Sequence, residues 1–104
     1  MDYTIQIAEE FTEEFEEICN YILNELNALD AAYRLKEKVK YKISLLKIEP
    51  RMYTQINKLS KIKNTYRRII VNNYSILYTI EETKKVVYVA HIYYGGRNYI
   101  DDLL

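Results

Sequence analysis

At 104 residues, the chain is long enough for one domain with a single apolar core that needs neither a metal ion nor a disulfide. Its 15 basic and 15 acidic residues give a formal net charge of zero, which excludes a polycation that binds nucleic acid over its whole surface. The opening residues predict no signal peptide, the apolar runs are too short to cross a membrane, and a single cysteine excludes an internal disulfide. We therefore expect a cytoplasmic protein with no membrane contact.

The first predicted elements are a short strand and a helix. Side chains alternate from Tyr3 to Ala8, which is typical of a strand with one buried face. From Glu9 to Leu26, apolar residues at steps of three and four predict a helix with one stripe, formed by Phe11, Phe15, Ile18, Cys19, Ile22 and Leu26. The helix dipole accounts for the glutamates of the first turns. Because Cys19 lies on the stripe, we interpret it as a core residue and not as a nucleophile.

A second helix is predicted from Ala31 to Lys47, with Asp30 as its N-cap and Pro50 after its end. Its apolar stripe consists of Ala32, Leu35, Val39, Ile43 and Leu46. The short break before it predicts an antiparallel helix pair that a sheet must cover. Met52 to Asn64 is then a long basic connection with a partial turn or an edge strand, and it is a candidate for a binding role.

Three strands are predicted in the last third, from Tyr66 to Val71, Tyr74 to Ile80 and Val86 to Tyr94. Asn72-Asn73 suits a two-residue hairpin turn, because asparagine tolerates positive φ. With that turn, one face carries Ile69, Val71, Tyr74, Ile76, Tyr78 and Ile80, with Arg67 at its end. The other face carries Tyr66, Arg68, Ile70, Ser75, Leu77 and Thr79. The first should meet the helices, and the second is the face on which to look for function; a turn one residue longer would exchange them.

The order of elements is strand, helix, helix, strand, strand, strand. It predicts an α+β fold, β-α-α-β-β-β, in which a mainly antiparallel sheet carries a helical hairpin on one face and residues 1–104 form a single domain.

The chemistry-bearing residues are few. With one His and one Cys there is no metal-ligand cluster, and we expect no cofactor. His91 lies inside the last strand, where packing in the sheet is favoured over a role in proton transfer, although histidine is competent for both. Between Pro50 and Ile80 there is no acidic residue, while six basic residues occur: Arg51, Lys58, Lys61, Lys63, Arg67 and Arg68. This segregation indicates either an anionic partner or an ordinary solvated surface.

Three segments together resemble one protein family. They are Arg67-Arg68, Asn73-Tyr74-Ser75-Ile76-Leu77-Tyr78 and Tyr93-Tyr94-Gly95-Gly96-Arg97-Asn98-Tyr99. With the helical hairpin before them, they resemble the RelE/ParE superfamily of bacterial toxins from type II toxin–antitoxin (plasmid stabilisation) systems, over nearly the whole chain. The first half is more similar to the ParE side. The resemblance implies a growth inhibitor that a cognate antitoxin neutralises.

The resemblance implies two different activities. Some members are ribosome-dependent mRNA endonucleases, and others are similar to ParE and poison DNA gyrase. In the nuclease pattern, the catalytic residues here would be Arg68, Arg97 and Tyr99. RNA or another target would be bound by Arg51, Lys58, Lys61, Lys63 and Arg67.

This sequence lacks two of the positive charges of the nuclease pattern, and Tyr99 lies nearer Arg97 than that pattern prefers, with Leu103 where the terminal tyrosine might be. Ser75 stands where an arginine usually follows the hairpin tyrosine, and no basic residue occurs near Ile70. Two missing charges would leave a scissile phosphate poorly stabilised, since one such contact is often worth about 3 kcal/mol of barrier. We therefore favour a ParE-like toxin that acts on gyrase, with the mRNA endonuclease and an inactive family member as alternatives.

Overall fold

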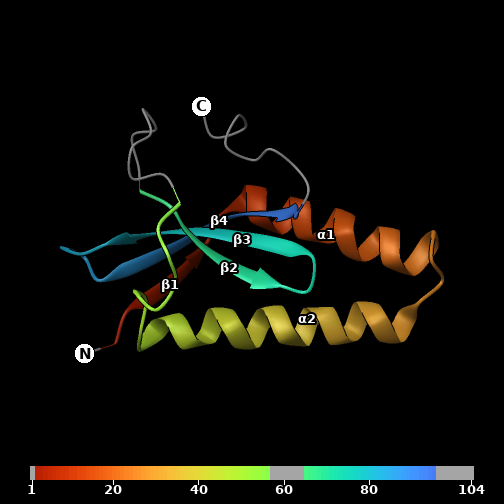
Figure 1. Cartoon of the computed structure of the whole chain (residues 1–104), viewed down its shortest axis with the longest axis horizontal. Coiled ribbons are helices and arrows are strands. Elements are labelled where there is room, and N and C mark those ends of the chain that lie inside the picture. Colours follow the sequence, from red (N-terminus) through yellow and green to blue (C-terminus); the bar gives the residue numbers. More distant parts are fainter. Residues whose placement is uncertain (1, 57–64, 96–104) are drawn as a thin grey trace.

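The fold is α+β, with two helices packed against a four-stranded mixed sheet in a computed structural model that describes residues 2–56 and 65–95 (Figure 1). The elements are β1 (Thr4–Ile7), α1 (Glu9–Asn24), α2 (Leu29–Ser44), the 3-10 helix η1 (Leu45–Lys47), β2 (Arg67–Val71), β3 (Tyr74–Glu81) and β4 (Val86–Tyr94). The strand order is β1-β4-β3-β2, and only β1 and β4 are parallel. The predicted fold class and element order are confirmed. No helix within the described ranges has the length and apolarity needed to cross a membrane.

The β2–β3 hairpin has the predicted two-residue turn. Asn72 adopts a positive φ of 54°, and Val71 pairs with Tyr74 directly across the turn. The rest of the register follows, with Ile69 opposite Ile76 and Arg67 opposite Tyr78. The predicted inner face is therefore correct, and four of its members are at most 2 % exposed in the core: Ile69, Val71, Ile76 and Tyr78.

A β-bulge in β4 keeps one face of that strand buried along its whole length. Leu77 pairs with His91 but Tyr78 pairs with Val89, so Ala90 is the extra residue. The bulge moves the inward-facing positions of β4 from odd to even numbers. As a result Val87, Val89 and Ile92 all reach the core and are at most 1 % exposed.

Both helices bury their predicted stripes, but their ends differ from the prediction. Helix α1 ends at Asn24, because Asn27 adopts a left-handed φ of 49° that stops the helix; Leu26 is 56 % exposed and does not join the stripe. Helix α2 begins at Leu29, so Asp30 lies in the first turn and is not the N-cap. There its carboxylate interacts favourably with the helix dipole. The predicted end at Lys47 includes a final 3-10 turn, η1.

The connection after α2 is fixed to the sheet by Tyr78. Its buried hydroxyl donates a hydrogen bond of 2.6 Å to the carbonyl oxygen of Pro50, and its ring packs edge-on against Tyr53. Farther along, Gln55 forms an isolated bridge with Arg67, which gives the predicted connection edge-strand character at this point. Burial raises the pKa of Tyr78 from 10.0 to about 12.

We predict that Tyr78→Phe lowers the free energy of unfolding by about 1–3 kcal/mol, because the Pro50 carbonyl loses its buried donor. Unfolding in urea at neutral pH measures the loss. Tyr88→Phe is the matched control, since Tyr88 lies partly exposed on the other face, and it should change stability by less than about 0.5 kcal/mol.

The same tyrosine makes stability depend on alkaline pH. Its pKa is higher in the folded chain than in the unfolded chain, so the unfolded state loses its proton first and stability falls as the pH rises from 10 to about 12. In the Tyr78→Phe variant, the part of the stability loss between pH 10 and about 12 that comes from Tyr78 should be absent. An identical alkaline decrease in both proteins would contradict this account.

Candidate functional site

Arg67 and Arg68 point to opposite faces of the sheet, because side chains alternate along a strand. Arg67 Nη1 donates hydrogen bonds of 2.6 Å to the Tyr53 carbonyl and 3.3 Å to the Arg51 carbonyl. These bonds hold the connection after α2 against β2. Arg67, predicted as a target-binding residue, thus has a structural role in the described chain.

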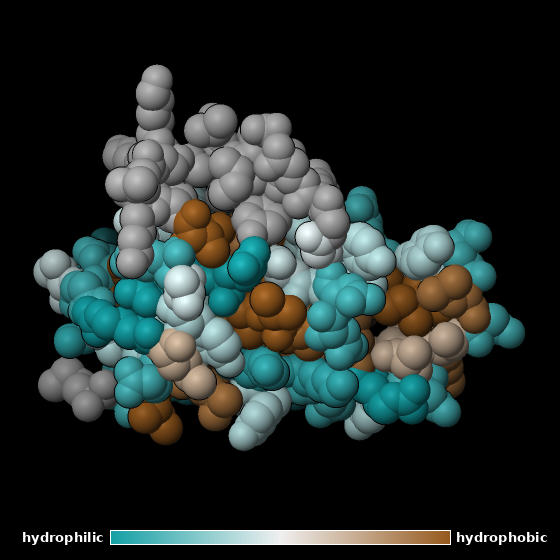
Figure 2. Space-filling view, in the orientation of Figure 1, coloured by the Kyte–Doolittle hydropathy of each residue, from teal (hydrophilic) through white to brown (hydrophobic). Residues whose placement is uncertain are grey.

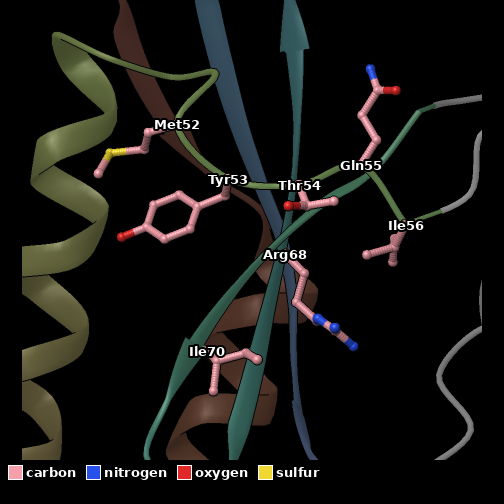
Figure 3. Close-up of a pocket in the computed structure, with 7 residues that line it drawn as sticks. All are labelled: Met52, Tyr53, Thr54, Gln55, Ile56, Arg68 and Ile70. Atoms are coloured by element: carbon pink, nitrogen blue, oxygen red, sulfur yellow. The ribbon is translucent and has the colours of Figure 1, made fainter.

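Arg68 lies on the face opposite the helices and separates two hollows. The larger of the two has a volume of about 590 Å³. It is lined by Met52, Tyr53, Thr54, Gln55, Ile56, Arg68 and Ile70. In Figure 3 the Tyr53 ring points toward α2, whereas the Arg68 guanidinium points away from it. The second hollow reaches from Arg68 across the hairpin turn to Tyr94 and Gly95. Arg68 therefore lines both hollows.

Strand pairing places Arg68 and His91 in one row across the sheet. Arg68 is opposite Leu77, and Leu77 is opposite His91. Two strand spacings make the row about 10 Å wide. In the next row are Ile70, Ser75 and Tyr93, and the His91 ring stacks on Tyr93 with centroids 5.2 Å apart. Leu77, Ser75 and Tyr93 are buried although they lie on this outer face.

Glu14 of α1 orients His91 and completes the edge of β4. Its carboxylate oxygens lie 3.2 and 3.3 Å from His91 Nδ1, and one of them accepts a 3.1 Å hydrogen bond from the Ile92 backbone N–H. Strand β1 pairs with β4 only as far as Val89, so Ile92 lies beyond the end of its neighbour strand. Because a carboxylate only accepts hydrogen bonds, Nδ1 of His91 is the donor in this contact.

Sequence reasoning did not identify Glu14. It was one of six glutamates that the helix dipole explained equally well, and its partners are 77 and 78 residues away. The only signal that could have found it is the difference in length between β1 and β4, which leaves the edge of β4 uncovered after four paired residues.

The other predicted residues are not brought together with Arg68. Arg51 forms an exposed ion pair with Glu82, which raises the pKa of Arg51 and lowers the pKa of Glu82; such pairs contribute little to stability. Arg97, Tyr99, Lys58, Lys61 and Lys63 lie outside the described residues and remain predictions.

Within the described ranges, no group of three or more His, Cys, Asp and Glu side chains is placed to hold a metal ion. Cys19 is half-buried, and desolvation raises the pKa of its thiol, which makes it a poor nucleophile at neutral pH.

We predict that Glu14→Ala lowers the free energy of unfolding by about 1–3 kcal/mol, since it removes the acceptor of the Ile92 N–H and of His91. Hydrogen exchange should show faster exchange of the Ile92 amide than in the parent chain. Glu13→Ala removes the exposed neighbouring carboxylate and is the control. Equal effects of the two substitutions would rule out the edge-capping role of Glu14.

Comparison with known proteins gives the family. A family model described as the ParE toxin of the type II toxin–antitoxin system parDE matches residues 5–99. No curated protein matches the chain.

Solved structures share the fold at low sequence identity. The toxin of the archaeal RelE–RelB complex from Pyrococcus horikoshii is 16 % identical with a TM-score of 0.59, covering 93 % of this chain and 99 % of that one. The chromosomal ParDE system of P. aeruginosa is 10 % identical with a TM-score of 0.69, covering 88 % and 95 %. A free E. coli RelE with two Arg-to-Ala substitutions is 19 % identical with a TM-score of 0.65, covering 99 % and 94 %.

The fold, the helical hairpin and the family match over most of the chain lead to one conclusion: this chain belongs to the ParE toxin family of type II toxin–antitoxin systems.

Proposed function

We propose that this toxin arrests growth in the manner of ParE, by protein contact with DNA gyrase, and not by cutting RNA. The observation that supports it is the orientation of the two arginines of β2. Strands β2, β3 and β4 contain only these two Lys or Arg residues, and Arg67 is bonded to backbone carbonyls on the inner side. Arg68 is then the one arginine or lysine that these three strands present on the outer face.

Cleavage of RNA would need more positive charge at the site than contact with a protein does. Attack by a 2′-hydroxyl needs a base, an acid for the leaving oxygen and cations around a phosphate that gains negative charge. The neighbours of Arg68 in the described part of the outer face are mainly uncharged, with Ile70, Ser75 and Leu77 closest in the register. Of these, Ser75 and Leu77 are buried and Ile70 is 56 % exposed. An exposed apolar side chain beside an arginine suits contact with a protein, in which Arg68 serves as a rim or anchor residue.

A RelE-type mRNA endonuclease is the second candidate, and the row from Arg68 to His91 favours it. His91 is oriented by Glu14, as a proton-transfer group must be, and Arg68 supplies a positive charge about 10 Å away across Leu77. In this alternative Arg68, Arg97 and Tyr99 would be catalytic, and the Lys58–Lys63 segment would contact RNA phosphates.

The test is inducible expression in a bacterium, with gyrase–DNA complexes and a defined transcript both measured in the same arrested cells. We expect trapped, cleaved DNA–gyrase complexes and an intact transcript. Transcript cuts that depend on the ribosome, with DNA unaffected, would reverse the assignment in favour of the endonuclease. Growth without arrest at a normal level of folded protein would mean that the chain is inactive.

The proposal includes a cognate antitoxin as partner and places the toxin in the bacterial cytoplasm, with a role in plasmid stabilisation. The neighbouring structures from P. horikoshii and P. aeruginosa are a RelE–RelB complex and a ParDE system. In this chain, β1 forms one edge of the sheet and pairs only with β4 among the described strands. A hollow of about 650 Å³ beside that edge contains Lys40 and Lys47. An extended acidic antitoxin segment would extend the sheet there and place its carboxylates beside these lysines.

We expect the double substitution Lys40→Glu/Lys47→Glu to weaken antitoxin binding at least about tenfold, because like charges would face each other along the edge strand. Calorimetric titration with the antitoxin encoded beside the toxin measures the affinity. Lys84→Glu, a single reversal in the exposed β3–β4 turn, is the control. Unchanged affinity in the double variant would exclude the β1 edge as the binding place.

A further inference from the structure

The two helices carry opposite charge. Helix α1 contains six glutamates and no lysine or arginine. Helix α2 contains five basic residues, Arg34, Lys36, Lys38, Lys40 and Lys42, against the acidic Asp30 and Glu37, which gives 5 − 2 = +3. Nearly all of these side chains are exposed; only Glu14 and Lys42 are half-buried. One surface layer of the molecule is therefore divided into an acidic and a basic half.

No ion pair among the described residues joins the charges of the two helices. Among the described residues, the ion pairs are those of Arg51 with Glu82 and of Glu14 with His91, and neither joins α1 to α2. Lys38 donates a hydrogen bond to the Asn72 side chain, which is neutral. Helices of opposite charge lie next to each other in the fold, yet no glutamate of one forms an ion pair with a lysine or arginine of the other in the described part.

Large apolar side chains are exposed on the same helices. Tyr21 is 56 % exposed on α1, and Tyr33 and Tyr41 are 64 % and 63 % exposed on α2. Leu26 and Leu29 are exposed where the helices are joined, and hydrophobic side chains gather at that end of the molecule (Figure 2). Tyrosine is enriched in protein interfaces, because it combines apolar area with a hydroxyl that remains hydrogen-bonded.

We propose that the free toxin forms a two-fold symmetric dimer in which α1 of each copy packs against α2 of the other. A second copy of this chain is the partner that these surfaces fit, since it brings the basic helix to the acidic one and the acidic helix to the basic one at the same time. Tyr21, Tyr33 and Tyr41 supply the apolar contact between the charged rows. This inference goes beyond the proposed function and does not depend on which target the toxin inhibits.

The size and charge of the interface set its strength. Two helices of 16 residues are each about 24 Å long and about 10 Å wide. Together they offer a footprint of a few hundred Å² per copy, at the low end of specific interfaces. The dimer is therefore reversible, and its stability depends on salt, because exposed charges are screened beyond about 8 Å at physiological ionic strength.

Sedimentation of the purified chain over a range of micromolar concentrations tests the proposal. We expect a monomer–dimer equilibrium at low salt whose dissociation constant rises about tenfold or more at about 1 M salt. Glu13→Lys/Glu17→Lys leaves α1 with four glutamates and two lysines, and Arg34→Glu/Lys38→Glu leaves α2 with three basic and four acidic residues. Each variant alone should have a dissociation constant about tenfold or more above that of the parent chain. Mixing the two variants should restore the affinity of the parent chain, because one contact of the mixed dimer joins the two reversed helices and the other joins the two unchanged helices.

Two controls make the outcome decisive. Lys84→Glu reverses a charge outside the helices and should leave dimerisation unchanged, and circular dichroism of every variant should show the parent helix content. A chain that is monomeric at low salt throughout the concentration range overturns the proposal. So does a dimer whose affinity is unchanged in both double variants, or a mixture of folded variants that dimerises no more tightly than each variant alone.

Discussion

The register of the β2–β3 hairpin is the constraint on which the rest of this structure depends. Side chains alternate with period two, so a shift of one residue would turn the apolar row from Ile69 to Tyr78 outward and leave the helices without a sheet to cover. The positive φ of Asn72 fixes that register. The same geometry separates the two adjacent arginines, one against backbone carbonyls and the other on the outer face.

The far edge of the sheet is completed by a helix instead of a strand. Strand β1 ends before β4 does, and the chain then enters α1, whose Glu14 carboxylate takes the place of the missing strand at Ile92. An unpaired strand edge is a risk for aggregation, so this contact limits exposure of the part of β4 that leads to Gly95. It also orients His91 toward one fixed partner. Packing and site geometry are thus determined by the same carboxylate.

Alternating side chains and turn chemistry were sufficient to predict the strands, their faces and the α+β fold, because the inner face of the hairpin is almost wholly apolar. Helix ends were predicted less well. Leu26 fits the stripe of α1 by its spacing, yet a backbone reversal at Asn27 removes it from the helix. Contacts between residues distant in sequence could not be predicted, as Glu14 with Ile92 and Tyr78 with Pro50 show. Arg67 and Arg68 look equivalent in sequence, and only the register distinguishes their surroundings.

The most direct test of this account compares Arg67→Ala with Arg68→Ala, measuring both the free energy of unfolding and growth arrest at matched levels of folded toxin. We expect Arg67→Ala to destabilise the fold by about 1–3 kcal/mol, since two carbonyls lose their charged donor, while the folded fraction still arrests growth. Arg68→Ala should lose the arrest with a smaller change in stability. The reverse result, with arrest lost in folded Arg67→Ala and retained in Arg68→Ala, would contradict the assignment of the outer sheet face as the functional one.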